Sequence, residues 1–160
     1  MSFIDQIKDR AKQEIKTIVL PEATDARILE ATQIVNNEGY AKVILVGNEE
    51  EVRQIAKEKG IDIGDTLIID PAKSEKIDEY ANILYELRKA KGMTEEQAHQ
   101  LVLDPVYYGM MMVKQSEADG LVSGAAHSTS DTLRPALQIL RTSPGTKLVS
   151  AFFVMVVPDC

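Results

Sequence analysis

Residues 119–140 read DGLVSGAAHSTSDTLRPALQIL, and this stretch is typical of a strand followed by a loop and a helix, a pattern that recurs along the chain. Its first apolar residues are typical of the end of a buried strand. A loop of small and hydroxyl-bearing residues follows at 123–130, and an amphipathic helix comes next, with Arg134 near its start. Backbone N–H groups in a first helical turn lack partners within the helix, and the helix dipole favours negative charge there. We therefore expect a phosphate-bearing ligand at this loop.

The same alternation of strand and helix continues along the rest of the chain. Apolar runs predict strands, and periodic spacing with capping residues predicts helices. The expected strands are 17–20, 41–46, 66–69, 120–123 and 147–157, and the expected helices are 2–15, 25–38, 49–59, 73–91, 94–104, 106–117 and 132–140. Because these strands are apolar along their length, they predict a mainly parallel sheet covered on both faces, a three-layer α/β/α fold. Ligands of such sheets bind beyond the carboxyl ends of the strands, where the 123–130 loop would lie.

Composition limits the function classes. The chain has 160 residues and a net charge of −7, which disfavours a nucleic-acid partner. The only cysteine is Cys160, so no disulfide can form within the chain, as is typical of a reducing compartment. The first residues lack a signal-peptide pattern, and the longest apolar run, 148–157, is too short to span a membrane. We expect a cytoplasmic protein with no membrane partner.

The hydroxyl residues before the last helix have two interpretations. Ser128 and Asp131 have the spacing of a capping box, which would make them structural. Gly124 lets the backbone approach a ligand closely, which favours a binding role. Pro135 lacks an N–H group, so either the helix begins late, near Asp131, or it bends at Pro135. Thr24 is expected to cap the helix 25–38.

Two arginines are candidate anion ligands. Arg134 begins a polar stripe that continues with Gln138 and Arg141, opposite an apolar stripe formed by Leu133, Leu137 and Leu140. Arg88 lies at the edge of the apolar stripe of helix 73–91. Each is either a surface cation whose stem covers apolar surface or a guanidinium directed into a cleft.

Other chemistry has weaker support. His127 lies in the candidate loop as a base or a hydrogen-bond donor, while His99 is expected to be structural or exposed. No metal site is expected, because the histidines and the cysteine do not cluster at ligand spacing. The run Met110–Met112 is expected in the core. The chain contains neither the Gly-x-Gly-x-x-Gly pattern nor a Walker-type phosphate loop, and the local spacing of its residues supports no nucleophile–base pair.

Several segments carry a resemblance to a known family. They are TIVLPEATDARILEA at 17–31, VILVGNEEEV at 43–52, YELRKAKGMT at 85–94, the block 119–140, and SAFFVMVVPDC at 150–160. Together they resemble the N-terminal half of the phosphate acetyltransferases (phosphotransacetylases), within the phosphate acetyl/butyryltransferase family. The text AHSTSDTLRPALQI looks closer to the acetyl-specific members. The resemblance runs from Lys8 to Cys160.

The resemblance implies a cytoplasmic acyltransferase that interconverts acetyl-CoA plus phosphate with CoA plus acetyl phosphate. It implies a homodimer, no bound cofactor or metal, and CoA as a substrate. Each subunit would have two α/β domains of the isocitrate/isopropylmalate dehydrogenase-like type, with the active site between them. On that basis residues 1–146 form an incomplete first domain, and residues 147–160 form the first strand of a truncated second domain.

The resemblance also implies site residues. Arg88 and Arg134 match CoA-contacting arginines, and Ser128 and Thr129 match the loop that faces the acyl-phosphate end. Arg27 and Cys160 match residues near the site. The family's central catalytic residues match nothing in this chain, so the 160-residue fragment alone is expected to be inactive. The alternatives are a butyryltransferase-like enzyme and a non-catalytic binding or assembly module.

Overall fold

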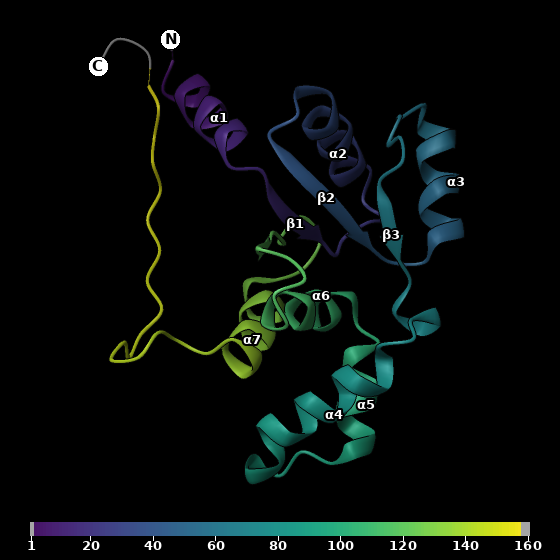
Figure 1. Cartoon of the computed structure of the whole chain (residues 1–160), viewed down its shortest axis with the longest axis vertical. Helices are drawn as coiled ribbons and strands as arrows, with labels where there is room; N and C mark the ends of the chain where they lie inside the picture. The colour runs from purple at the N-terminus through teal and green to yellow at the C-terminus, as the bar shows by residue number, and fades with distance from the viewer. Residues whose placement is uncertain (1, 158–160) are drawn as a thin grey trace.

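The centre of the molecule is a sheet of four parallel strands in the order β3-β2-β1-β4. The computed structural model describes residues 2–157. The strands are β1 (Lys16–Leu20), β2 (Ala41–Val46), β3 (Leu67–Ile69) and β4 (Gly120–Leu121). The helices are α1 (Phe3–Gln13), α2 (Ala26–Glu38), α3 (Glu49–Lys59), α4 (Ile77–Arg88), α5 (Glu95–Val102), α6 (Pro105–Lys114) and α7 (Thr129–Ile139). The predicted α/β class with a parallel sheet is confirmed (Figure 1).

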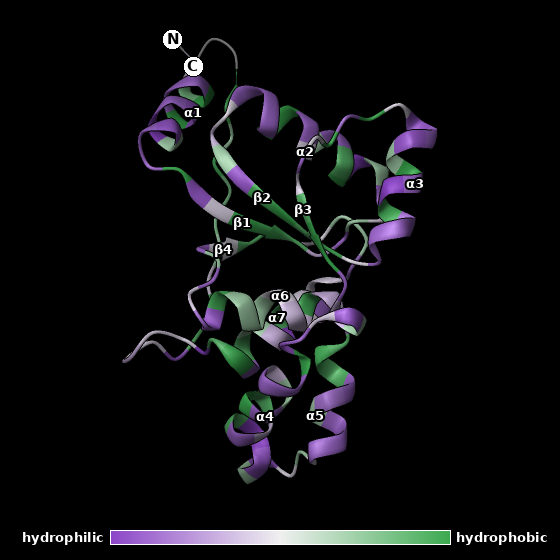
Figure 2. Cartoon of the chain, turned by 45° about the vertical axis from the view of Figure 1, so that its right-hand side comes forward, coloured by the Kyte–Doolittle hydropathy of each residue, from purple (hydrophilic) through white to green (hydrophobic). Residues whose placement is uncertain are grey.

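Helices cover both faces of the sheet. In Figure 2, α2 and α3 lie on one face and α6 and α7 on the other, while α4 and α5 form a pair beyond α6. Successive side chains of a strand point to opposite faces, so β2 contributes to two apolar clusters. Leu45 packs in the cluster with Leu29 of α2, and Val46 packs in the cluster with Met111 of α6. This burial on both faces explains why the strands are apolar along their length.

Helix α6 approaches the sheet closely. Met110, Met111 and Met112 are all buried, which confirms that the methionine run belongs to the core. A Cβ atom added to Gly109 would lie 2.6 Å from Leu121 Cδ1 and 2.9 Å from Val19 Cγ1. The absence of a side chain at Gly109 therefore allows α6 to lie directly on β1 and β4.

Local capping signals placed several helix ends well. Thr94 and Gln97 form the expected capping box, and Gly39 ends α2 in a left-handed conformation. The cap of α2 is Asp25 and not Thr24, because the Asp25 carboxylate accepts the Arg27 N–H. The single helix expected over 73–91 is instead α4 between two short 3₁₀ turns, Pro71–Lys73 and Lys89–Lys91.

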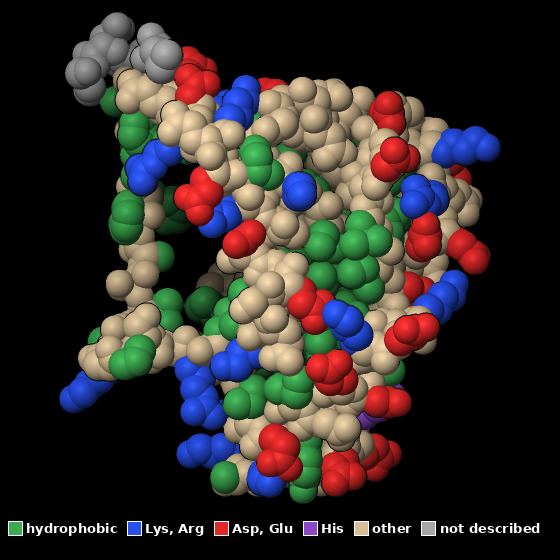
Figure 3. All heavy atoms as spheres, in the orientation of Figure 1, with side chains coloured by type: hydrophobic (Ala, Val, Ile, Leu, Met, Phe, Trp, Pro, Cys, Tyr) green, Lys and Arg blue, Asp and Glu red, His purple; other side chains and the backbone are tan. Residues whose placement is uncertain are grey.

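The expectation of a strand at 147–157 was wrong. Residues 147–157 form no strand. A strand needs a neighbouring strand for its backbone hydrogen bonds, and no described residue pairs with this segment. Phe152 and Phe153 are 86% and 93% exposed, and the segment stands clear of the body in Figure 3. The apolar stripe of α7 formed by Leu133, Leu137 and Leu140 is largely exposed, because α7 packs through Pro135 and Ile139. The division at residues 146 and 147 stays a prediction.

Candidate functional site

Glu22 is the most strongly held side chain near the carboxyl ends of the strands. It follows β1, and its carboxylate is 1% exposed. Four consecutive backbone N–H groups of the loop after β4 donate to it at 2.7–3.0 Å, those of Gly124, Ala125, Ala126 and His127. Because β1 and β4 are parallel neighbours, their carboxyl ends bring Glu22 to a loop about 100 residues later in the chain.

This arrangement changes the interpretation of the predicted anion cradle. The loop does present converging N–H groups, as expected, and such a nest binds negative charge. The nest is filled by the protein's own carboxylate. The N–H groups of residues 124–127 are therefore already used within the protein.

Two further side-chain contacts hold the same loop. His127 Nδ1 lies 2.8 Å from Glu22 Oε1. Arg27 Nη2 donates to the Ala125 carbonyl at 2.6 Å and also pairs with Asp25 at 2.6 Å. The structure thus places Arg27 against the candidate loop, with its guanidinium held by a carboxylate and a carbonyl.

The nest determines the ionisation of Glu22. Burial alone would raise the pKa of this carboxyl, but the N–H groups of Ala126, Ala125 and His127 and the His127 imidazole outweigh burial and lower the pKa from 4.5 to about 2. Glu22 is therefore a carboxylate at neutral pH. Its negative charge is compensated by five hydrogen bonds in a buried setting.

The lowered pKa predicts how the stability of the chain depends on pH. Since the folded pKa of Glu22 is below the unfolded pKa, its contribution is complete above about pH 5 and is lost as the pH falls toward 2. The lowering of the pKa from 4.5 to about 2 corresponds to about 3 kcal/mol of the free energy of unfolding at neutral pH. Denaturant unfolding between pH 7 and pH 3 should show a weaker loss of stability in Glu22→Gln than in the unchanged chain. An equally steep loss in both proteins would contradict the assignment, and exposed Glu30→Gln is the matched control.

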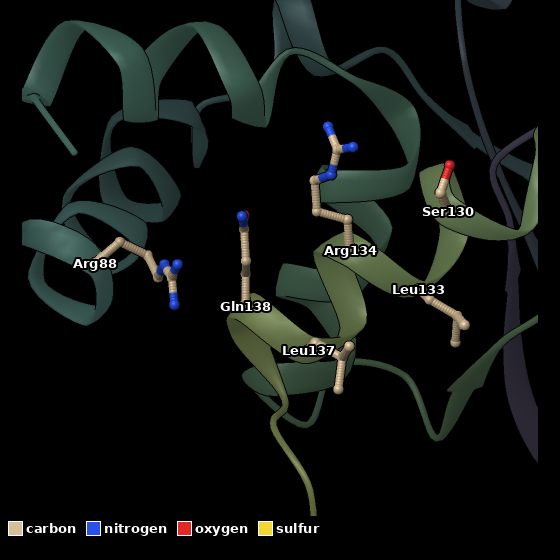
Figure 4. A pocket seen from close by; sticks show the side chains of 6 residues that line it. All are labelled: Arg88, Ser130, Leu133, Arg134, Leu137 and Gln138. Atoms are coloured by element: carbon tan, nitrogen blue, oxygen red, sulfur yellow. The ribbon is translucent and has the colours of Figure 1, made fainter. Parts of the chain in front are cut away.

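An open pocket of about 390 Å³ lies between α4 and α7. Arg88, Ser130, Leu133, Arg134, Leu137 and Gln138 line it. In Figure 4, Arg88 reaches from α4 toward α7, and Gln138 stands between the two guanidinium groups. Leu133 and Leu137 project from α7 on another side. The pocket therefore combines two cations with exposed apolar surface.

Neither cation of this pocket is neutralised within the described chain. Among residues 2–157, no ion pair involves Arg88 or Arg134. The Nε atom of Arg88 is buried and has no hydrogen-bond partner in this part of the chain. Unpaired guanidinium groups on one pocket suit a phosphate ligand, which they can bind through paired N–H donors.

Tyr107 is a site residue that sequence reasoning missed. Its ring is buried, and its hydroxyl donates to Gln138 Oε1 at 2.9 Å. Burial raises the pKa of Tyr107, while the positive charges of Arg134 and Arg88 act in the opposite direction. Tyr107 thus stays a neutral donor that orients Gln138 between the arginines. The sequence showed only that the residues next to Tyr107 along the chain are apolar.

The start of α7 carries the other predicted residues. Ser128 is the N-cap and forms a capping box with Asp131, so the structural interpretation of this pair is correct. Thr129 is the first residue of the helix, which excludes the late start near Asp131. No hydrogen bond among the described residues uses the N–H groups of Thr129 or Ser130. These two donors remain available to an anion.

Other predicted features lie elsewhere or outside the described residues. His99 is on the surface, 3.2 Å from Asp78 Oδ1. Cys160 lies outside the described residues. Within 2–157, no cluster of three or more His, Cys, Asp or Glu side chains could hold a metal ion. The helices in the same range are too short or too polar to cross a bilayer.

Comparisons with known proteins identify the family of this chain. The family model "Phosphate acetyl/butaryl transferase" matches residues 2–160. Phosphate acetyltransferases of Acetivibrio thermocellus and Thermoanaerobacterium thermosaccharolyticum are 59% and 54% identical over all 160 residues, which correspond to 48% of each relative. The EutD phosphotransacetylase structure from Staphylococcus aureus is 42% identical with a TM-score of 0.88, covering 98% of this chain and 47% of that one. The chain therefore spans about half the length of these relatives, and it belongs to the phosphate acetyl/butaryl transferase family.

Proposed function

We propose that this chain supplies the CoA-binding part of a phosphate acetyltransferase, which transfers an acetyl group reversibly between acetyl-CoA and phosphate. The observation that carries the proposal is the pair of unneutralised guanidinium groups, Arg88 and Arg134, on one open pocket. CoA is a multiply phosphorylated thioester carrier, so its charges match these cations. The exposed leucines of the same pocket suit its apolar portions.

The phosphate end of the reaction belongs to the start of α7. Ser128 and Thr129 border the free N–H groups of the first turn, about 8 Å along the helix from Arg134. Positive charge and N–H donors there would stabilise the oxyanion and the departing phosphate when the CoA thiolate attacks acetyl phosphate. Arg27 supports this end by fixing the adjacent loop. No resident cofactor takes part in this chemistry, and CoA is a substrate.

The groups that carry out bond making are assigned to the other half of a full-length protein. In that proposal the 160-residue chain binds CoA but turns over very slowly or not at all, and the full-length protein is a cytoplasmic homodimer. A thiol-release assay with acetyl-CoA and phosphate tests the division of roles. Release by the full-length protein and almost none by residues 1–160 is expected. Robust release by the short chain would disprove the division, and a preference for butyryl substrates would disprove acetyl specificity.

A further inference from the structure

Glu22 is a buried carboxylate that the chemistry of acetyl transfer does not explain. It contacts neither arginine of the pocket, yet it accepts four backbone N–H groups and the His127 imidazole. Burying a charge is unfavourable unless hydrogen bonds satisfy it. Five partners on one loop satisfy it and tie that loop to the end of β1. The loop leads directly into the capping residue Ser128.

We propose that Glu22 is the positioning residue of the phosphate end of this site. Its carboxylate takes the place of an external anion in the nest of residues 124–127 and so fixes where the first turn of α7 presents its N–H groups. The inference rests on the proposed function, because it names what those N–H groups bind. Glu22 itself would contact neither substrate.

The Glu22 carboxylate also determines which ring nitrogen of His127 carries the proton of their shared hydrogen bond. An ionised carboxylate can only accept hydrogen bonds, so the proton on the shared bond is carried by His127 Nδ1. Nε2 is then the ring nitrogen left for other contacts, and the side chain is 32% exposed. Glu22 therefore orients the imidazole as well as the backbone at the point where α7 begins.

Arg27 forms a further contact with the same loop. The Ala125 carbonyl accepts from Arg27 Nη2, while the Ala125 N–H donates to Glu22. One peptide segment is thus held between a cation and an anion that both follow β1. The arrangement favours one loop conformation, and preorganised N–H donors are what a phosphate site requires.

The first test examines the nest itself in the 160-residue chain. A glutamine at position 22 keeps the size of the side chain, but its NH₂ group opposes the N–H groups that face it. Glu22→Gln should speed hydrogen exchange of the amides of residues 124–127 by about 30-fold or more, with little change in β2. Glu22→Asp keeps the charge and should show an intermediate effect. Unchanged exchange in Glu22→Gln would overturn the proposal.

The second test separates positioning from folding in the full-length protein. Glu22→Gln should raise KM for acetyl phosphate and for phosphate by about 30-fold, while the dissociation constant of CoA changes by less than about threefold. A merely structural role would reduce the folded fraction and so lower the apparent turnover number, with KM and the dissociation constant of CoA unchanged, and that result would overturn the proposal. If Glu22→Gln is too unstable to assay, the same comparison is made with Glu22→Asp. Glu30→Gln, an exposed carboxylate on α2, should match the unchanged enzyme.

These readouts keep the two proposals distinguishable. If the unchanged full-length protein neither binds CoA nor transfers acetyl groups, the proposed function fails, while the exchange experiment still reports on the nest. If the unchanged protein is active and Glu22→Gln weakens both substrates equally, only the positioning role fails.

Discussion

CoA binding to the full-length protein is expected to weaken by about a thousandfold when Arg88 and Arg134 are both replaced with alanine. Hydrogen bonds from a charged group contribute about 1.5–3 kcal/mol each, and a thousandfold change is about 4 kcal/mol. Both guanidinium groups line one pocket, and neither has an ion-pair partner among residues 2–157. Their removal therefore leaves no compensating cation from the described pocket.

Calorimetric titration with CoA and steady-state kinetics measure this effect. Arg134→Ala alone should cost at least about tenfold in CoA affinity and in turnover, about 1.4 kcal/mol. Lysine at either position keeps the charge but loses the paired N–H donors, so it should restore only part of the affinity. Arg53→Ala is the matched control, because Arg53 pairs with Glu49 on the surface of α3. Unchanged affinity in the double variant would remove both arginines from the site.

Elements whose ends are determined by residues close to them in the sequence were predictable. The bounds of α3 and β2 agree with the sequence prediction. For α3 the reason is local, because Asn48 caps its start and Gly60 ends it. Arg88 was a candidate because it lies at the edge of the apolar stripe of its helix, and Arg134 because it lies near the start of a helix beside the hydroxyl-rich loop. Their sharing of a pocket depends on how α4 and α7 pack, which helical periodicity does not report.

The missed features depend on contacts between distant segments. Glu22 reaches Gly124 across 102 residues, and only the parallel pairing of β1 with β4 brings them together. A signal was present, since a carboxylate directly after one strand faces a small-residue loop after another. The strand predicted at 147–157 failed for the complementary reason, because a strand requires a paired neighbour as well as apolar residues.

Gly109→Val is expected to destabilise the chain by about 4 kcal/mol, and Gly109→Ala by about 2 kcal/mol. The added Cβ would meet Leu121 Cδ1 at 2.6 Å and Val19 Cγ1 at 2.9 Å, both in the sheet beneath α6. Alanine gains about 1 kcal/mol of helix propensity over glycine, so the expected loss for Gly109→Ala is what remains after that gain. Movement of α6 away from the sheet would relieve the contact only by opening gaps around Met111, which is fully buried.

A double-mutant cycle identifies the cause of this loss. Leu121→Ala removes the nearest atom, so in the Gly109→Ala background it should cost at least about 1 kcal/mol less than in the unchanged chain. Leu137→Ala, at an exposed position on α7, should show no such coupling. Denaturant unfolding of the four proteins measures each free energy of unfolding. Additive losses at Gly109 and Leu121 would mean that steric contact with the sheet is not the reason for glycine at this position, and the close packing of α6 would then need another explanation.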